Sequence, residues 1–313
     1  MINNPLPGVP LIESPLARIV EDSFTDDWER SVALSLHRHG MAILDFPDPD
    51  LSDRIDRIQS KFQTHFGFDM NDPDVVKYGD LRIQDAWSFD EDVRAIAANP
   101  AMCKLLSSLY GRPAFPFQTL NFPIGTQQAM HTDAVHFSSL PERFMCGVWL
   151  AMEDVTADCG ALRYIPGSHR WPILTNVTVG RRGTPLGEES PQSPYHDVWD
   201  TLVTASGIAE HIFLAKKGQA LIWCANLLHG GGPRLDERST RWSQVTHYLF
   251  DDCIYYTPAF SNEPMGDFAL RNVVDVATNL PRVNSYLGNP VEPLTPPRKS
   301  RWNRMLQGKP REG

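Results

Sequence analysis

The chain has 313 residues, of which 42% are hydrophobic, and a formal net charge of −9 at pH 7. That length and apolar content suffice for one large core, so we expect a single domain over residues 1–313. The acidic balance, without any long run of Lys or Arg, argues against nucleic acid or an anionic membrane as a partner. No apolar stretch reaches the roughly 18 residues that a membrane-spanning helix needs.

The N-terminal segment and the cysteines indicate the compartment. The first residues, MINNPLPGVPLIESP, are rich in proline and lack the basic and then apolar pattern of a signal peptide. The five cysteines are odd in number, scattered, and never spaced as CxxC. We interpret them as reduced, packed thiols of a cytoplasmic protein.

The N-terminal part, residues 17–115, is predicted to be mostly helical. Within residues 26–38, apolar Trp28, Val32 and Leu36 recur at helical spacing, and Gly40 follows as a candidate C-cap. Further elements are expected as a strand over residues 41–46, a helix over 51–66, and helical segments over 91–110 that are interrupted at Asn99-Pro100.

From Pro116 the pattern changes to short runs of β-branched and aromatic residues between turn residues, which favours a jelly-roll or barrel over residues 116–257. The expected strands are 117–122, 129–133, 145–153, 160–165, 211–213, 219–223 and 242–251. Residues 180–206 interrupt this series as a long insertion, with a short helix expected near 198–202. An extension over 258–313 is expected to contain a helix at 268–277 and a loosely ordered basic tail at 295–313.

Two stretches carry residues suited to a metal. His131 and Asp133 are separated by one residue, so an extended backbone would place both side chains on one face, with Thr132 pointing away. A second histidine, His229, follows about a hundred residues later. Two histidines and one carboxylate are the ligand set of non-haem Fe(II) oxygenases, which leaves three metal positions open. The pair His37 and His39 has similar spacing but lies at a predicted helix end, and we assign it no role.

Four segments together resemble the phytanoyl-CoA dioxygenase family of Fe(II)/2-oxoglutarate oxygenases. They are His131-Thr132-Asp133, WLAMED at residues 149–154, GALRYIPGSH at 160–169, and His229-Gly230-Gly231 followed by Arg241. The resemblance runs from about residue 33 to residue 250. It implies a mainly β fold with flanking helices, in which a double-stranded β-helix (jelly-roll, cupin-like) forms the core and the N-terminal helices pack outside.

The resemblance also implies Fe(II), 2-oxoglutarate and O2 as cofactors. His131, Asp133 and His229 would hold the metal, and Arg241 would bind the distal carboxylate of 2-oxoglutarate. An inward-pointing arginine needs a charged partner, which a dicarboxylate supplies; Arg238 is the alternative anchor. The other residues expected to bind the cosubstrate are Gln118, Trp149, Thr132 and Gly231. Gln118 could instead face solvent, and Trp149 could be a core residue.

The expected reaction is hydroxylation of an unactivated C–H bond of a small molecule, with release of succinate and CO2. Desaturation, epimerisation and cyclisation use the same cofactors and stay open, as does a non-catalytic metal-binding protein. Halogenases of this superfamily have Ala or Gly at the position of Asp133, so the carboxylate favours hydroxylation. The residues expected to contact substrate are His136, Phe137, Arg143, Tyr195 and Trp199. The last two belong to the insertion, which we interpret as a lid, whereas His169 is expected to be structural.

Overall fold

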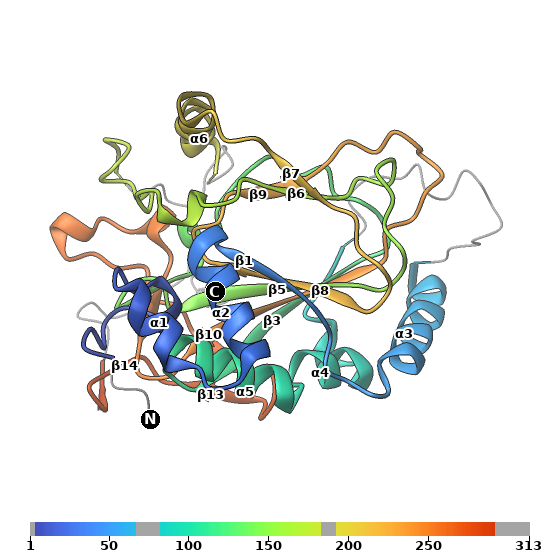
Figure 1. Ribbon diagram of the computed structural model, residues 1–313, viewed down its shortest axis with the longest axis horizontal. Coiled ribbons are helices and arrows are strands. Elements are labelled where there is room, and N and C mark those ends of the chain that lie inside the picture. Colours follow the sequence, from blue (N-terminus) through green and yellow to red (C-terminus); the bar gives the residue numbers. More distant parts are fainter. Residues whose placement is uncertain (1–3, 67–81, 183–191, 292–313) are drawn as a thin grey trace, which may run out of the picture.

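The computed structural model describes residues 4–66, 82–182 and 192–291, and its core is a pair of antiparallel sheets (Figure 1). The larger sheet consists of β1 (Met41–Asp45), β8 (Gln219–Cys224), β5 (Met145–Ala151), β10 (Ser243–Phe250), β3 (Ala114–Phe122) and β2 (Ile83–Gln84), in this spatial order. The smaller sheet consists of β7 (His211–Phe213), β6 (Leu162–Tyr164) and β9 (His229–Gly231). In Figure 1 the smaller sheet lies over one face of the larger sheet.

Alternation along the strands sorts side chains into two apolar layers. In β5, Val148 and Leu150 pack into the cluster beneath the helices, whereas Trp149 packs into the cluster between the sheets. In β8, Ile222 faces the helices and Leu221 the smaller sheet. Because both faces of the larger sheet are covered, its central strands are buried along their whole length. The face between the sheets is the one that can line an internal site.

The helices cover the other face of the larger sheet. They are α1 (Ala17–Ser23), α2 (Asp27–His39), α3 (Leu51–Phe66), α4 (Glu91–Ala97) and α5 (Pro100–Tyr110), with α6 (Ser193–Ser206) on the opposite side of the molecule. Helix α2 shows why these segments are helical: Asp26 caps its first turn by accepting a hydrogen bond from the backbone N–H of Glu29, and Gly40 ends it at φ 76°. The helical N-terminal part is therefore confirmed for the described residues. None of the described helices is long and apolar enough to cross a membrane.

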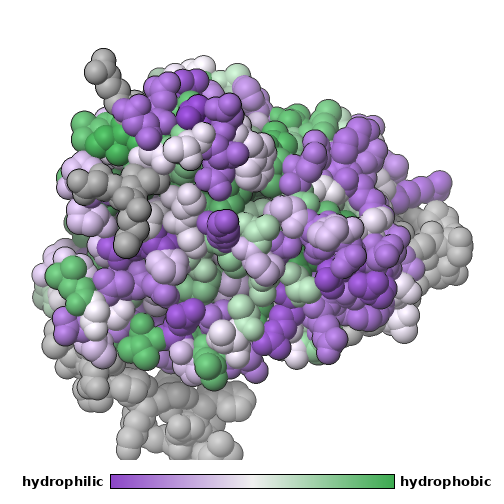
Figure 2. Space-filling view, turned by 60° about the horizontal axis from the view of Figure 1, so that its bottom comes forward, coloured by the Kyte–Doolittle hydropathy of each residue, from purple (hydrophilic) through white to green (hydrophobic). Residues whose placement is uncertain are grey.

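Short elements complete the structure. Pairs of strands are β4 (Ser138–Leu140) with β11 (Ile254–Tyr256), β12 (Val273–Asp275) with β13 (Leu280–Arg282), and β14 (Ser285–Tyr286) with β15 (Asn289–Pro290). The 3-10 turns are η1 (Leu11–Glu13), η3 (Ala86–Ser88), η4 (Asp133–Val135), η5 (Ser168–Arg170), η6 (Pro258–Phe260) and η7 (Glu263–Met265). On the face shown in Figure 2, hydrophilic residues predominate and hydrophobic ones form scattered patches.

Two sequence expectations for secondary structure were wrong, and a third was confirmed with different bounds. Residues 268–277 do not form a helix; they contain β12, whose pairing with β13 is supported by an ion pair between Asp275 and Arg282 at 2.8 Å. Residues 129–133 do not form a strand, because only a bridge between His131 and His229 joins them to a neighbour, and η4 begins at Asp133. The helix expected at 198–202 is the longer α6. The expected tail at 295–313 lies outside the described residues, and the division into one domain stays a prediction.

Candidate metal and cosubstrate site

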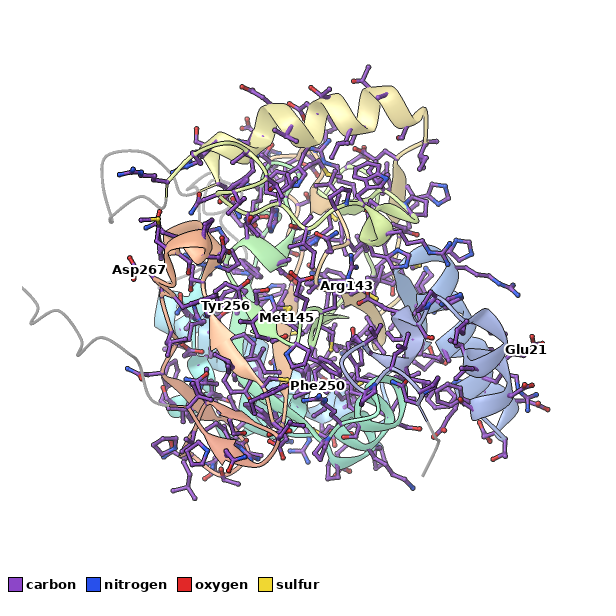
Figure 3. The ribbon with its side chains drawn as sticks, turned by 90° about the vertical axis from the view of Figure 1, so that its left-hand side faces the viewer. Glu21, Arg143, Met145, Phe250, Tyr256 and Asp267 are labelled. Atoms are coloured by element: carbon purple, nitrogen blue, oxygen red, sulfur yellow. The ribbon has the colours of Figure 1, made fainter. Side chains whose placement is uncertain are left out.

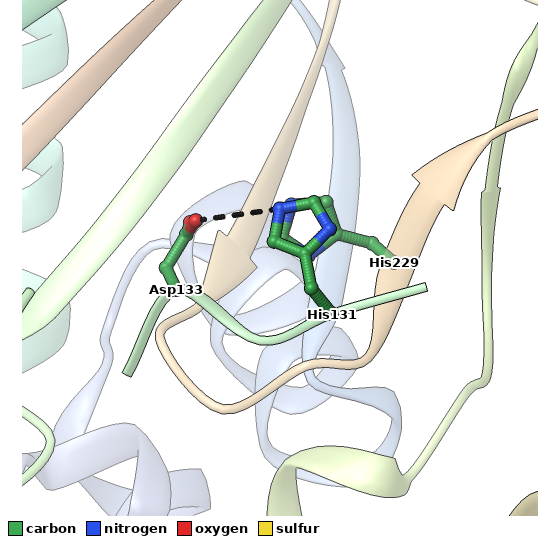
Figure 4. A group of neighbouring side chains, drawn as sticks. All are labelled: His131, Asp133 and His229. Carbon is green, nitrogen blue, oxygen red and sulfur yellow. Dashed lines mark ion pairs between the residues drawn. The ribbon is translucent and has the colours of Figure 1, made fainter. Parts of the chain in front are cut away.

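The three predicted metal ligands converge between the sheets (Figure 4). His131 and His229 exchange backbone hydrogen bonds of 2.9 and 3.0 Å, which brings their ring centroids to 4.5 Å. Thr132 is extended, at φ −112° and ψ 144°, so the side chain of Asp133 projects to the same side as that of His131. One ligand atom from each of the three residues lies within 4.8 Å of the others, and all three residues are buried.

The backbone selects the tautomer of both histidines. The Nδ1 atoms of His131 and His229 each lie 2.9 Å from the carbonyl oxygen two residues earlier, on Ala129 and Leu227. A carbonyl can only accept, so each Nδ1 carries the proton and each Nε2 keeps its lone pair for a metal. Burial lowers the pKa of His131 to about 3, with His229 acting in the same direction, so the imidazole is neutral near pH 7. Neutral imidazole is the form that binds metal.

Asp133 is held as a carboxylate. Burial alone would raise its pKa, but His247, His229 and His131 and a hydrogen bond from Trp223 outweigh this effect, and the pKa lies below its usual value. The Trp223 indole N–H donates to Oδ2 at 2.6 Å, and Oδ1 lies 4.0 Å from His131 Nε2. Two neutral imidazoles and one charged carboxylate oxygen are therefore directed to one point.

A cavity of about 470 Å³ opens from this point. Its lining includes apolar Leu120, Phe122, Leu162 and Val245 together with Trp149 and Arg241. Arg241 is 3% exposed and donates from one terminal nitrogen to the Gly160 carbonyl at 2.9 Å. Arg238, the alternative anchor, is exposed.

Within the described residues, buried Arg241 forms no ion pair, which is unusual for an interior guanidinium. Its Nε, and also the indole Nε1 of Trp149, are buried and have no hydrogen-bond partner in the described part of the chain. Burial lowers the pKa of Arg241 to about 10, with Cys159 and Glu153 opposing the shift, so the group is still a cation near pH 7. Two such donors, in groups that both line the cavity, fit the carboxylate of a small diacid.

Other predicted cosubstrate residues have different surroundings. Gln118 lines the cavity, and its Oε1 accepts from His247 Nδ1 at 2.9 Å. Gly231 also lines the cavity, and a Cβ there would meet the Gln127 backbone nitrogen at 2.8 Å, so the glycine permits a close crossing of two chain segments. Thr132 is not one of the residues that line the cavity, and its hydroxyl is buried without a hydrogen-bond partner among the described residues.

Only some of the predicted substrate residues are near this cavity. His136 and Phe137 line it. Arg143, labelled in Figure 3, lies elsewhere: its guanidinium is paired with Glu13 at 2.7 Å and lines a separate hollow. Tyr195 and Trp199 are 0% and 2% exposed and pack in an apolar cluster with Ile165 and Leu228, which flank strands of the smaller sheet, so the structure does not bring them to the cavity. Part of the insertion, residues 183–191, lies outside the described residues.

Several lining residues were missed by sequence analysis. Trp223 belongs to the run QALIWC, which resembles an ordinary buried strand. His247 was not predicted as a site residue, although it approaches Asp133 Oδ2 to 3.6 Å. Arg82, Gln84, Gln128 and Gln192 also line the cavity and were not predicted. For His247 the sequence does contain a signal, because alternation along an extended strand from Arg241 puts both side chains on one face.

Two histidines and a carboxylate facing a cavity that ends in a buried arginine define the class of non-haem iron oxygenases that use a dicarboxylate cosubstrate. The family model for phytanoyl-CoA dioxygenase (PhyH) matches residues 45–241, and the chain belongs to this family. The resemblance is thus confirmed. The family's enzymes are 2-oxoglutarate-dependent dioxygenases that use Fe(II), 2-oxoglutarate and O2.

Curated relatives match part of the chain. A probable phytanoyl-CoA dioxygenase of Caenorhabditis elegans is 26% identical over 167 residues, which are 50% of this chain and 50% of the relative. The peroxisomal phytanoyl-CoA dioxygenase of Rattus norvegicus is 24% identical over 152 residues, 49% of this chain and 41% of the relative. The match therefore spans half or less of the length of these relatives.

Solved structures share the fold. EctD from S. alaskensis, crystallised with 2-oxoglutarate and 5-hydroxyectoine, has a TM-score of 0.56 at 19% identity, over 88% of this chain and 93% of its own. The α-ketoglutarate-dependent carbocyclase SnoK from nogalamycin biosynthesis has a TM-score of 0.55 at 14% identity, over 75% and 88%. At these identities the likeness shows the fold alone.

Proposed function

We propose that this protein is an Fe(II)- and 2-oxoglutarate-dependent dioxygenase that hydroxylates a C–H bond of a small polar molecule, and that its paired sheets form the double-stranded β-helix of that class. The observation that carries the proposal is Arg241, a buried cation that lines the cavity and has an N–H without a partner among the described residues. A protein that only bound metal would not need this second site.

The residues present fit the metal and the cosubstrate. His131, Asp133 and His229 would hold Fe(II), and Arg241 with Trp149 would bind the distal carboxylate of 2-oxoglutarate, whose methylene groups would lie among Leu120 and its apolar neighbours. When bound, iron and 2-oxoglutarate supply the oxidation, in which O2 is consumed and succinate and CO2 are released. The chain's own part is to orient both groups and to keep bulk water from the buried end.

The exposed part of the cavity lining supports a polar substrate. Eight of the lining residues are partly or fully exposed: Arg82, Gln84, Leu120, Thr126, Gln128, His136, Phe137 and Gln192. Six of these eight side chains are polar, whereas an aliphatic acyl chain would be expected to bind among apolar side chains. The amide Nε2 of Gln128 lies 3.3 Å from His131 Nε2, the atom expected to bind metal, so this amide must turn toward the cavity when metal is present.

The test is turnover of 2-oxoglutarate with Fe(II) and ascorbate, read as succinate, across hydroxylated and carboxylated metabolites and acyl-CoA esters. Stimulation by polar compounds and a product heavier by one oxygen are expected. A product that has lost two hydrogens would indicate desaturation or cyclisation, and one of unchanged mass epimerisation. The Asp133→Ala variant should lose the activity. No binding of 2-oxoglutarate by the metal-loaded wild type would contradict the proposal.

A further inference from the structure

Trp223 contacts two of the three metal-site residues. Its indole N–H donates to Asp133 Oδ2 at 2.6 Å, a short bond between two buried groups. Its ring packs against the His229 ring, with centroids 4.6 Å apart and planes at 38°. Trp223 itself is 2% exposed and comes from β8, the strand that precedes His229. One side chain on a rigid strand therefore touches both a carboxylate and an imidazole of the site.

His247 also has a ring nitrogen near Asp133 Oδ2, but this nitrogen does not donate a hydrogen bond to it. His247 Nε2 lies 3.6 Å from Asp133 Oδ2, which is too long for a hydrogen bond. The Nδ1 of the same ring is 2.9 Å from Gln118 Oε1 and must carry the proton to donate there, which leaves Nε2 of the neutral ring without a hydrogen. The orientation of Asp133 thus depends on the indole N–H of Trp223.

A glycine on the adjacent strand, Gly147 of β5, leaves space for the indole of Trp223. Trp223 is opposite Gly147 in the pairing of β8 with β5. A Cβ on Gly147 would lie 2.3 Å from two atoms of the indole ring, closer than atoms in contact can approach. The ring therefore lies across the backbone of Gly147, and its N–H is directed past that backbone to Asp133. A side chain at position 147 would displace it.

We propose that Trp223 is a positioning residue that holds Asp133 as a one-oxygen metal ligand. With Oδ2 engaged by the indole, Oδ1 is the oxygen left for the metal, and it is the one that faces His131 at 4.0 Å. A carboxylate that turned to bind with both oxygens would occupy a fourth position of a six-coordinate ion. Only two positions would then remain for a bidentate cosubstrate and O2, which need three. This inference rests on the proposed function, because it assumes a metal at these ligands.

The test uses Trp223→Phe, which keeps a ring beside His229 and removes the N–H. Loss of such an outer partner typically weakens metal binding by about 10–100-fold, so we expect the Co(II) dissociation constant from calorimetry to rise within that range. The visible spectrum of the Co(II) protein should also change, and its response to added 2-oxoglutarate should weaken. These readouts are independent of turnover.

Two variants serve as controls. Trp199→Phe changes a buried tryptophan of α6 and should leave Co(II) binding within about twofold of wild type, well below the effect of losing an outer partner. Trp149→Phe removes an indole N–H from the same cavity without touching a metal ligand, so it should weaken 2-oxoglutarate binding and leave the affinity for Co(II) unchanged. Wild-type Co(II) affinity and spectrum in a folded Trp223→Phe would overturn the inference.

A measurement on the wild type covers the case in which Trp223→Phe does not fold. With 15N-labelled tryptophan, the Trp223 indole proton should resonate downfield and exchange slowly with water, both before and after Zn(II) is added. Loss of this protection when Zn(II) binds would show that the bond to Asp133 breaks in the loaded site, and would overturn the inference. Failure of the wild type to bind either metal would instead count against the proposed function.

Discussion

The guanidinium of Arg241 lies over the indole ring of Trp149, 5.5 Å from the ring centroid. The stacking orients both groups, since the ring face attracts the cation while the edges of both groups stay free to donate hydrogen bonds. Each group retains one buried N–H without a partner in the protein. A carboxylate bound here would satisfy both donors, and this geometry leads to the first prediction.

Arg241→Ala should weaken 2-oxoglutarate binding by roughly two to four orders of magnitude, because losing one member of a buried charged pair costs about 3–5 kcal/mol. Metal affinity should be unchanged, since Arg241 is not among the metal ligands. The Arg241→Lys variant keeps the charge but not the planar donors, so an intermediate loss is expected. Calorimetric titration of 2-oxoglutarate into Co(II)-loaded protein measures the affinity for the cosubstrate. Titration of Co(II) into the metal-free protein measures the affinity for metal.

The matched control is Arg238→Ala, which removes an exposed arginine three residues earlier and should leave the affinity for 2-oxoglutarate within about twofold, as is usual for screened surface charges. If Arg241→Ala binds the cosubstrate like wild type while Arg238→Ala does not, the assignment of the anchor is reversed.

The convergence of His131, Asp133 and His229 could be predicted from the sequence because the geometry of the first two is local. His131 and Asp133 need only one extended residue between them, and that conformation persists at Thr132 although no strand forms there. The position of His229 followed from the family resemblance. Trp223 could not be predicted, because its hydrogen-bond partner lies 90 residues away in the chain and the contact depends on the register of two strands.

Surface and packing roles were harder to separate. Arg143 was expected to contact substrate, but a sequence does not show that buried Glu13, 130 residues away, already pairs with it. The apolar spacing in residues 268–277 fits a helix, yet β-branched Val273 and Val274 pair with a neighbouring segment that supplies a hairpin. In the first case a distant contact decides, and in the second a pairing with the next segment that the apolar spacing does not show.

The second prediction concerns α6. Because Trp199 is 2% exposed in an apolar cluster, Trp199→Ala should lower the free energy of unfolding by about 3–5 kcal/mol. Binding of 2-oxoglutarate and the KM for substrate should change little in the folded variant. Urea unfolding gives the first quantity and steady-state kinetics the second. The control is Trp28→Ala, at an exposed helix position. A raised KM without lost stability in Trp199→Ala would contradict the prediction and would indicate that Trp199 contacts substrate.

The third prediction concerns the ion pair between Arg143 and Glu13, a residue of η1 near the N-terminus. Arg143 bonds both the Glu13 carboxylate and the His169 carbonyl at 2.7 Å, so Arg143→Ala would leave the buried Glu13 charge uncompensated. We expect a loss of about 3–5 kcal/mol in unfolding free energy. The control is Arg163→Ala, whose partner Glu210 is exposed and for which only about 0–1 kcal/mol is expected. Equal losses in the two variants would contradict a buried pair.

The fourth prediction is an acid-dependent loss of stability through His169. This side chain is 1% exposed, and burial, followed by the nearby Arg170 and Arg143, lowers its pKa to about 3 in the folded protein. The unfolded chain has the ordinary histidine pKa of about 6.5, so between these values it binds a proton that the folded protein does not. The contribution of His169 is therefore fully present above about pH 6.5 and falls as pH decreases, by about 1.4 kcal/mol per pH unit.

Urea unfolding of metal-free protein from pH 7.5 to the lowest pH at which it stays folded tests this directly. His169→Gln should lower stability by a similar amount at every pH above about 6.5, because packing is lost there without any change in proton binding. Below that pH its curve should fall less steeply than that of wild type, since one of the groups that take up a proton on unfolding has been removed. His211→Gln, which changes an exposed histidine on β7, controls for the loss of a histidine as such. Parallel plots of unfolding free energy against pH for wild type and His169→Gln would contradict the prediction, because they would mean that His169 is also charged in the folded protein below pH 6.5. Its side chain would then be more hydrated than its buried contacts with His37 and Gly40 imply.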